Sequence, residues 1–318
     1  MKQITIDAPC KINLSLDIVR RLENSYHEMD MVMQSVSLYD TLTLSLQEGS
    51  GQIRMTCSLE NKNAFLACDD SNIVIRCTKA FLNANDFSLS GQDLVIHLIK
   101  RIPMMAGLGG GSADGAAVLS ALNRLFETHL SCEQLEQIGV KIGADIPFCL
   151  RGGTLRARGI GELFSPLPAM PDCSIVIIKP DFGISTKNAF SRCDSAPYQH
   201  ADVEKMIAAL SSGNLLSIAG ALENVFEVLC SEEESAALSK ARSLLLENGA
   251  AGALLSGSGS ALFGIFSDSS RAKLCCQTLL SEMEKGKLLV IYKKATLLWK
   301  EFFSATQSHL VHSKANTF

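Results

Sequence analysis

A dense run of glycines offers the clearest chemistry in this chain of 318 residues. Residues 107–111 contain four glycines and lie directly before residues 112–126, where small and apolar side chains recur at helical spacing. Glycine lets the backbone turn sharply and bring its N–H groups close to a ligand. The start of the following helix adds unpaired N–H groups and the positive end of its dipole. This combination is typical of a polyphosphate site, with a flexible turn that only caps the helix as the alternative.

The order of the glycines excludes the two commonest nucleotide loops. A Walker A loop ends in Gly-Lys-Ser or Gly-Lys-Thr, and neither occurs in the sequence. A dinucleotide-binding G-x-G-x-x-G pattern starting at Gly107 would need glycine at position 112, which is Ser112. The loop therefore indicates a phosphate site of another kind.

Two charged residues outside the loop could act on a bound phosphate. Residues 11–18 alternate polar and apolar side chains, which predicts a half-buried strand with Lys11 and Asn13 on its polar face. Asp145 precedes Pro147, where the start of a helix would help to keep a carboxylate ionised. Phosphoryl transfer needs an oriented hydroxyl, an acceptor for its proton and cover for phosphate charge. A lysine and a carboxylate meet these needs, although a surface salt bridge is the alternative.

Five segments together resemble the motifs of the GHMP kinase family, which includes galactokinase and the homoserine, mevalonate and phosphomevalonate kinases. The glycine loop matches the family signature as P-x-x-x-G-L-G-G-G-S-A-D over residues 103–114. Four further segments resemble family motifs in chain order: Pro9-Cys-Lys-Ile-Asn-Leu14, Tyr26-His27, Gly143-Ala-Asp-Ile-Pro-Phe148 and Leu255-Ser-Gly-Ser-Gly-Ser260. The resemblance runs from residue 9 to about residue 266 and is strongest to one branch, which carries the Gly-Gly-Gly-Ser form of the loop.

The resemblance implies an α+β fold of two domains, the GHMP kinase fold, with the active site in the cleft between them. For the branch it implies ATP-dependent phosphorylation of the 2-hydroxyl of 4-diphosphocytidyl-2-C-methyl-D-erythritol, on the non-mevalonate route to isoprenoids. ATP and Mg²⁺ are the implied cofactors. Two alternatives stay open: phosphorylation of another small alcohol, such as homoserine or mevalonate, and a catalytically silent ligand sensor on the same fold.

The resemblance also assigns roles to individual residues. Lys11 and Asp145 take the catalytic roles, with Asp145 either removing the proton of the acceptor hydroxyl or only positioning that hydroxyl. The implied ATP-binding residues are Asn72, Pro103, Met104, Met105, Ala106, Gly107, Leu108, Gly109, Gly110, Gly111, Ser112 and Ala113. The implied acceptor-binding residues are Asn13, Tyr26, His27, Asp145, Thr186 and Phe190.

Several of these roles have structural alternatives. Two aromatic side chains, Tyr26 and Phe190, are expected to sandwich the cytosine ring while His27 hydrogen-bonds it, but Phe190 could instead be a core residue. Asn72 could equally cap a helix. Residues 256–260 either line the acceptor phosphates with backbone N–H groups or form a tight turn.

Some positions depart from the family pattern. Cys10 stands where the family usually has alanine, Asn24 and Ser25 replace an Asp-Gly pair, and Gly115 replaces a common alanine. Gly111 stands where mevalonate-type relatives have a serine that helps to hold magnesium. The resemblance therefore implies magnesium and leaves its protein ligands open.

Alternation and helical spacing predict the elements that position these residues. Strands are predicted at 11–18, at 42–46 after a turn at Tyr39 and Asp40, and at 95–99, 174–178 and 261–266. Helices are predicted at 72–84, 112–126, 132–142, 202–211, 215–230 and 235–248. Consecutive strands near the start favour antiparallel pairing, and so an α+β class over a doubly wound parallel sheet. We divide the chain into an ATP-binding domain (1–168), a C-terminal domain (169–304) and a polar tail (305–318).

Composition narrows the class of protein. Apolar residues make up 47% of the chain and charged residues 19%, so a substantial core can form. The formal net charge is -4, without a long block of one sign, which predicts no nucleic-acid partner. No apolar run approaches the roughly 20 residues that span a bilayer, and the N-terminus does not read as a signal peptide. Eleven scattered cysteines without a C-x-x-C pair predict reduced, buried thiols in a cytoplasmic protein. The sequence makes no prediction of oligomeric state.

Overall fold

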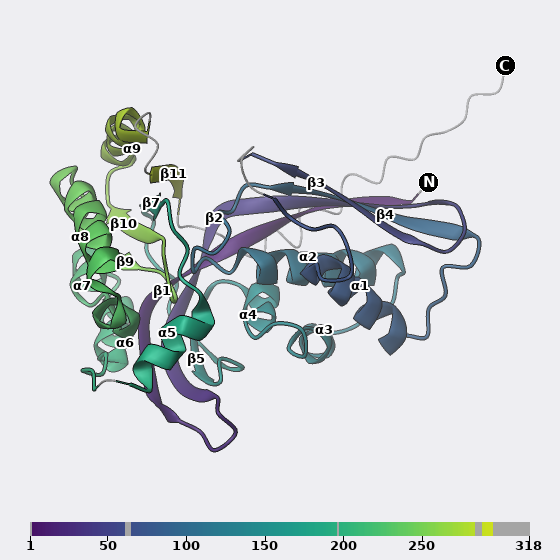
Figure 1. The fold of residues 1–318 in the computed structure, drawn as a ribbon, viewed down its shortest axis with the longest axis horizontal. Helices are drawn as coiled ribbons and strands as arrows, with labels where there is room; N and C mark the ends of the chain where they lie inside the picture. The colour runs from purple at the N-terminus through teal and green to yellow at the C-terminus, as the bar shows by residue number, and fades with distance from the viewer. Residues whose placement is uncertain (1, 61–64, 196, 284–287, 295–318) are drawn as a thin grey trace.

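The computed structural model describes residues 2–60, 65–195, 197–283 and 288–294. Two sheets organise this part of the chain (Figure 1). The first sheet has the strand order β3-β4-β2-β1-β8, with β5 paired to β2 and β6 paired to β5. Its strands are β1 (Gln3–Arg21), β2 (His27–Glu48), β3 (Ile53–Leu59), β4 (Gln92–Lys100), β5 (Thr154–Gly159), β6 (Leu163–Pro166) and β8 (Glu223–Asn224).

The long antiparallel pair of β1 and β2 forms the backbone of the first sheet. β2 pairs with β5 through residues 29–34 and with β4 through residues 41–48, so its two ends have different neighbouring strands. The β1–β2 register shifts between Pro9 and Lys11 and again between Asn13 and Ser15. Bulges of this kind re-aim side chains locally. They bracket Lys11 and Asn13, the two polar residues that the sequence placed on one face.

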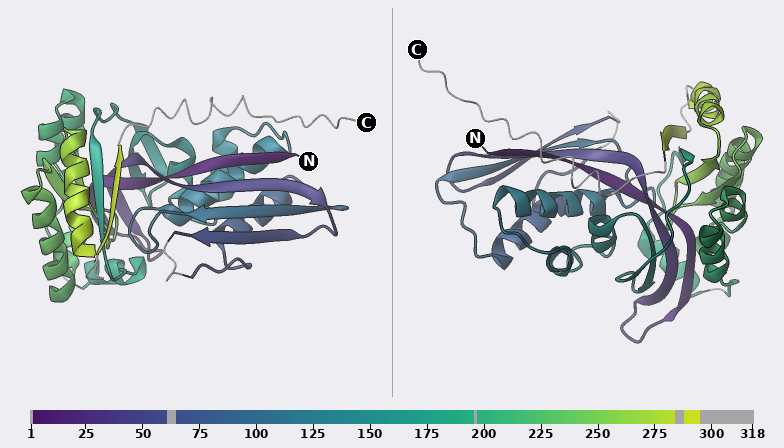
Figure 2. Two further views of the ribbon diagram at one scale, coloured as in Figure 1. Left: turned by 90° about the horizontal axis from the view of Figure 1, so that it is seen from above. Right: turned by 180° about the vertical axis from the view of Figure 1, so that it is seen from behind.

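Four helices cover one face of the first sheet (Figures 1 and 2). They are α1 (Ile73–Ala84), α2 (Gly110–Leu125), α3 (Cys132–Gly139) and α4 (Ile146–Arg151). The central helix α2 is buried along most of its length. Its many alanine and glycine residues let it pack closely against the sheet and neighbouring helices. This packing fixes the start of α2, and with it the glycine loop.

The second sheet is antiparallel throughout, with the order β11-β7-β10-β9. Its strands are β7 (Ser174–Pro180), β9 (Gly252–Leu255), β10 (Leu262–Phe266) and β11 (Leu288–Lys294). The helices of this half are α5 (Thr186–Cys193), α6 (Val203–Ser212), α7 (Leu215–Gly220), α8 (Glu232–Glu247) and α9 (Ser269–Met283), with a 3₁₀ turn at Val225–Leu229. α8 and α9 pack on the second sheet (Figure 2).

The α+β class and most of the predicted elements are confirmed, with two corrections. Tyr39 and Asp40 do not form a turn but lie inside β2. The Asp40 carboxylate accepts hydrogen bonds from the N–H groups of Arg101 and Ile102, so the polar residue is satisfied without leaving the strand. The helix predicted over 215–230 ends at Gly220, because Glu223 and Asn224 pair with β1 as β8.

The sheets fall on either side of the predicted domain boundary, because β6 ends at Pro166 and β7 begins at Ser174. β8, however, comes from the second half and joins the edge of the first sheet. The domain division stays a prediction, and its C-terminal limit and tail, residues 304–318, lie outside the described residues. All eleven cysteines are free thiols. Within the described ranges, no helix combines the length and apolar character needed to cross a membrane.

Candidate active site

The glycine loop lies between the two halves and hydrogen-bonds to β1 and to the segment that joins β9 and β10. The Lys11 N–H of β1 donates to the Leu108 carbonyl at 3.0 Å. From the other side, the Ala261 N–H donates to the Ala106 carbonyl at 3.1 Å, and the Ser256 hydroxyl donates to the Gly107 carbonyl at 2.9 Å. The loop carbonyls are thus occupied by the protein, and the loop holds a fixed position between the halves.

Positive φ angles explain why two of the glycines are needed. Gly107 has φ +73° and Gly109 has φ +66°, a region that side-chain-bearing residues rarely adopt. A Cβ at Gly107 would overlap the carbonyl oxygen of Ser256. A Cβ at Gly109 would lie 3.0 Å from Lys11 Cγ and 3.7 Å from Asp145 Oδ2. The loop therefore passes directly beside the predicted catalytic pair.

The helix α2 begins at Gly110, two residues earlier than predicted. Its first internal hydrogen bond of this turn joins the Ala113 N–H to the Gly109 carbonyl at 2.8 Å. The preceding N–H groups, at positions 110–112, have no acceptor within the helix. They form the anion-binding end of α2.

A pocket of about 940 Å³ surrounds the loop. Ligand sites usually measure roughly 300–1,000 Å³, so this pocket lies at the upper end of that range. The predicted ATP-binding residues that line it are Asn72, Pro103, Met104, Met105, Ala106, Gly107, Leu108, Gly109, Gly110, Gly111 and Ser112. The predicted catalytic and acceptor-binding residues that line it are Lys11, Asn13, Tyr26, His27, Asp145, Thr186 and Phe190. Ala113 is buried behind the loop instead.

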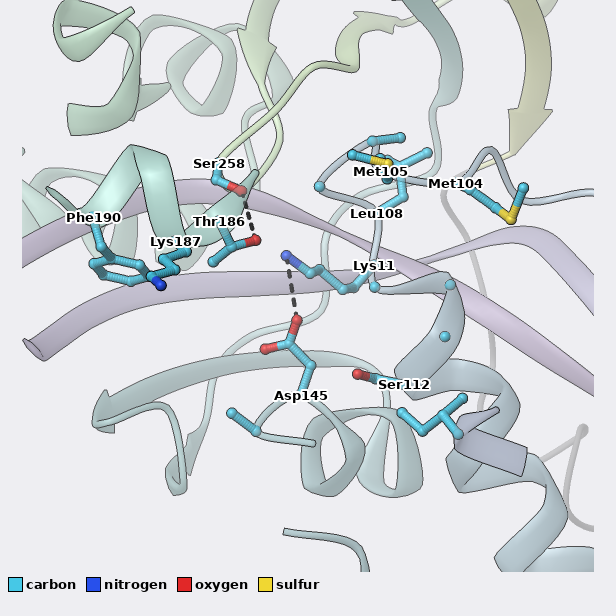
Figure 3. Close-up of a pocket in the computed structure, with 18 of the residues that line it drawn as sticks. Lys11, Met104, Met105, Leu108, Ser112, Asp145, Thr186, Lys187, Phe190 and Ser258 are labelled. Carbon is cyan, nitrogen blue, oxygen red and sulfur yellow. Dashed lines mark hydrogen bonds and ion pairs between the residues drawn. The ribbon is translucent and has the colours of Figure 1, made fainter. Parts of the chain in front are cut away.

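Lys11 and Asp145 face each other across the pocket (Figure 3). Lys11 Nζ lies 3.8 Å from Asp145 Oδ2 and donates to Asn13 Oδ1 at 2.7 Å. The Lys11 side chain is 6% exposed and the Asp145 side chain 33%. Asp145 immediately precedes α4 but makes no capping hydrogen bond to it. Its carboxylate is turned towards Lys11 and the pocket, where a hydroxyl can reach it.

The hairpin between β1 and β2 meets α5 at the other end of the pocket, which we call the base end (Tyr26, His27, Phe190 and Asp194). The rings of His27 and Phe190 stack with centroids 4.8 Å apart and an interplanar angle of 25°. Tyr26 is 59% exposed at the rim of the pocket. The structure thus brings the three predicted residues to one end of the pocket, with the Phe190 ring against His27.

Thr186 and Asn72, two further predicted site residues, also make contacts within the protein. Thr186 at the start of α5 approaches Ser258 with 3.1 Å between their hydroxyl oxygens, and Gly257 and Ser258 line the pocket (Figure 3). Asn72 caps α1, since its side-chain oxygen accepts from the Val74 N–H at 2.9 Å. Asn72 also lines the pocket. Its capping role is therefore observed, and its contact with the adenine of ATP stays a prediction.

A buried charged cluster beneath the loop was not predicted. Lys100 Nζ lies 2.6 Å from Asp114 Oδ2 and also contacts Asp40. A Cβ at Gly110 would lie 3.1 Å from Lys100 Nζ, which places this ammonium directly under the start of α2. The sequence held two hints of this cluster: Lys100 directly follows the strand predicted at 95–99, and Asp114 ends the glycine motif.

Burial shapes the ionisation of this cluster. Burial alone would lower the pKa of Lys100, but the two carboxylates raise it overall, so the amine stays charged. Burial raises the pKa of Asp114 well above its usual value, against the opposing effect of Lys100. Asp114 Oδ1 is buried without a hydrogen-bond partner. An ammonium paired with two carboxyl groups is therefore buried below the anion-binding helix end.

No group of three or more histidine, cysteine, aspartate or glutamate side chains in the described segments is arranged to hold a metal ion. Magnesium does not require such a group, because it usually keeps several waters and takes one or two protein ligands beside phosphate oxygens. The Ser112 side chain lies on the Asp145 side of the pocket (Figure 3). A hydroxyl and a carboxylate are oxygen ligands of the kind that magnesium accepts, so the site fits a magnesium ion that arrives with a nucleotide.

Comparison with known proteins gives a consistent result. Family models described as the N-terminal and C-terminal domains of GHMP kinases match residues 72–153 and 206–285. The chain is 35% identical over 299 residues to a 4-diphosphocytidyl-2-C-methyl-D-erythritol kinase of Alkaliphilus metalliredigens, covering 92% of this chain and 98% of that protein. It is 41% identical over 270 residues to the enzyme of that name from Carboxydothermus hydrogenoformans, covering 84% and 90%. A crystal structure of 4-(cytidine 5'-diphospho)-2C-methyl-D-erythritol kinase superposes with a TM-score of 0.68 at 28% identity, covering 92% and 98%.

Proposed function

Since the chain belongs to the GHMP kinase family, we propose that it transfers the γ-phosphate of ATP to the 2-hydroxyl of 4-diphosphocytidyl-2-C-methyl-D-erythritol. The match to relatives of that name covers 98% and 90% of their length, and it includes both halves of the fold. The reaction belongs to the non-mevalonate isoprenoid pathway.

One geometric observation carries the assignment: Lys11 and Asp145 lie between the glycine loop and the base end of the same pocket. A nucleotide whose phosphates reach the N–H groups at positions 110–112 points its terminal phosphate towards this pair. An acceptor whose base lies by His27 reaches the pair from the opposite side. The two reacting groups then meet where the ammonium and the carboxylate are.

Asp145 receives the proton of the acceptor hydroxyl in this proposal. Its side chain is the more accessible member of the pair, and its carboxylate is free of helix hydrogen bonds. Lys11 is held by Asn13 and its own ion pair, so its charge stays fixed beside the transferred phosphate. Fixed positive charge offsets the negative charge of the phosphoryl group.

Magnesium bound to ATP would neutralise phosphate charge. We assign Ser112 as a residue that would hold it, because its hydroxyl lies on the loop side of the pocket. The Met104–Met105 segment and Asn72, which also line the pocket, would surround the adenine.

The experiment that tests the function is an ADP-release assay against a panel of acceptors. The panel contains the cytidine diphosphate compound, 2-C-methyl-D-erythritol 4-phosphate, homoserine and mevalonate. The cytidine compound should be phosphorylated efficiently and the other three very poorly, because a site built to hydrogen-bond a base leaves its own polar atoms unpaired with a truncated acceptor.

Other outcomes of the assay identify the alternatives. Efficient turnover of homoserine or mevalonate would show that the proposed acceptor is wrong and that the kinase activity is right. Turnover of 2-C-methyl-D-erythritol 4-phosphate as fast as that of the cytidine compound would show that the base end does not recognise the acceptor. Binding of ATP without turnover of any acceptor would point to a ligand sensor.

A further inference from the structure

The base end contains a carboxylate that the sequence analysis did not single out. Asp194 is the C-cap residue of α5, and its Oδ1 lies 2.9 Å from His27 Nε2. Its Oδ2 lies 3.4 Å from an Arg21 guanidinium nitrogen. Arg21 and His27 are themselves cross-strand partners at the turn end of the β1–β2 hairpin. Each carboxylate oxygen therefore has its own partner on the hairpin.

α5 controls the His27 ring in two ways. Phe190 and Asp194 are four residues apart, so they lie on the same side of the helix. Phe190 stacks on the ring and sets its plane. Asp194 binds one ring nitrogen and sets which edge of the ring faces the pocket. The His27 side chain is 9% exposed, so the surrounding protein restricts its other orientations.

This contact has a consequence for the protons of His27. An ionised carboxylate only accepts hydrogen bonds, so the nitrogen that binds Asp194 must carry the hydrogen. In a neutral imidazole the other nitrogen, Nδ1, is then an acceptor. Among the residues that the structure describes, Nδ1 has no hydrogen-bond partner, and His27 lines the pocket. The base end thus offers a fixed acceptor.

A fixed acceptor distinguishes between pyrimidine bases. Cytosine carries an amino group at position 4, which donates hydrogen bonds, whereas a uracil-type base carries a carbonyl oxygen there, which only accepts. Nδ1 can accept a hydrogen bond from the amino group of cytosine. Opposite a uracil-type base it would meet the carbonyl oxygen, and two acceptors repel each other. An unmet acceptor of this kind lets a site reject an analogue far more strongly than a missing methyl group would.

We propose that Asp194 is a positioning residue that makes this site prefer a cytosine-linked acceptor over the matching uracil-linked acceptor, by holding His27 in the Nε2-protonated form. The inference rests on the proposed function and adds to it a residue and a reason for base choice. Asp194 acts through its hydrogen bond to His27.

The test compares kcat/KM for the cytidine diphosphate acceptor and for its uridine diphosphate analogue. The native enzyme should strongly prefer the cytidine compound. In Asp194→Asn the amide can either accept from Nε2 or donate to it, so both forms of His27 become available. The preference should fall by about tenfold or more, on the scale of a hydrogen bond to a charged group. KM for ATP should stay within about twofold, because the change is local to the base end.

Arg21→Gln is the matched control. It removes the second partner of Asp194 and leaves the bond to His27 in place. The base preference should be largely retained. If Arg21→Gln lowers it as much as Asp194→Asn does, docking of α5 on the hairpin explains the effect and the inference is wrong. The inference also fails if Asp194→Asn lowers kcat/KM equally for both acceptors.

A second readout needs no turnover. Nitrogen-15 NMR of histidine-labelled native protein, with His27→Gln to assign the signals, distinguishes a protonated from an unprotonated ring nitrogen. In the neutral ring Nε2 should carry the hydrogen and Nδ1 should not, and a signal for the opposite form overturns the proposal. Absence of native activity with the cytidine compound would instead reject the proposed function, whatever the NMR shows.

Discussion

The loop end and the base end of the pocket hold their ligands by different means. At the loop end, backbone carbonyls of residues 106–108 accept hydrogen bonds from β1 and from the β9–β10 connection, two glycines adopt positive φ, and a buried ion cluster lies beneath. At the base end, stacking and hydrogen bonds between side chains form the site, and Tyr26 is 59% exposed. Substitutions at the loop end should therefore change folding and both ligands together, while those at the base end should change one ligand alone.

Lys100→Met should have the largest effect. It leaves Asp40 and Asp114 buried without their shared cation, and removing one partner of a buried ion pair costs about 3–5 kcal/mol. The free energy of unfolding, measured by urea titration, should fall by that amount. Lys79→Met, which removes an exposed lysine paired with Asp70, is the control and should change little. Native stability in Lys100→Met would show that the cluster does not support the loop.

Gly107→Ala should be nearly as damaging. The positive φ alone costs a side-chain-bearing residue roughly 1–2 kcal/mol, and the overlap with Ser256 forces the loop away from the second sheet. Turnover and stability should both drop. Gly91→Ala provides the control, because Gly91 has φ +80° but no atom within 4 Å of a built Cβ. If the two variants behave alike, backbone strain accounts for the loss and close contact between the halves does not.

Asp145→Asn tests the point where the two ends meet. Loss of a general base reduces turnover by about a hundredfold or more, and the amide keeps the shape of the side chain. kcat should fall while the binding of ATP and the unfolding midpoint stay near native values. Lys11→Met should be similarly inactive. Glu127→Gln, at an exposed pair with Lys2, serves as the control for loss of a carboxylate. Near-native kcat in Asp145→Asn would assign the proton to another group.

Tyr26→Ala should have the smallest effect and the most selective one. Stacking of a base on an aromatic ring contributes roughly 1–3 kcal/mol. KM for the cytidine acceptor should rise by about tenfold or more, while KM for ATP and the stability stay unchanged. Tyr26→Phe keeps the ring and should behave as the native enzyme. A parallel rise in both KM values would contradict the division of the pocket into two independent ends.

The sequence alone determined the parts of this protein that depend on local backbone chemistry. A glycine run before a helical pattern can be recognised directly, since glycine tolerance of positive φ and the unpaired N–H groups of a helix start are properties of short segments. Alternation placed Lys11 and Asn13 on one side of a strand, and the structure joins them by a hydrogen bond. The five motifs indicated the family because their order along the chain is specific.

Only the tertiary structure decided which distant residues meet. Lys100, Asp40 and Asp114 come from β4, β2 and α2, and their cluster exists because helix and sheet pack together. Asp194 reaches His27 across 167 positions of sequence. Residues 223–224 became a strand because β1 offered an open edge, which no local propensity encodes. Contacts of this kind depend on packing between elements, and a linear pattern describes only the elements themselves.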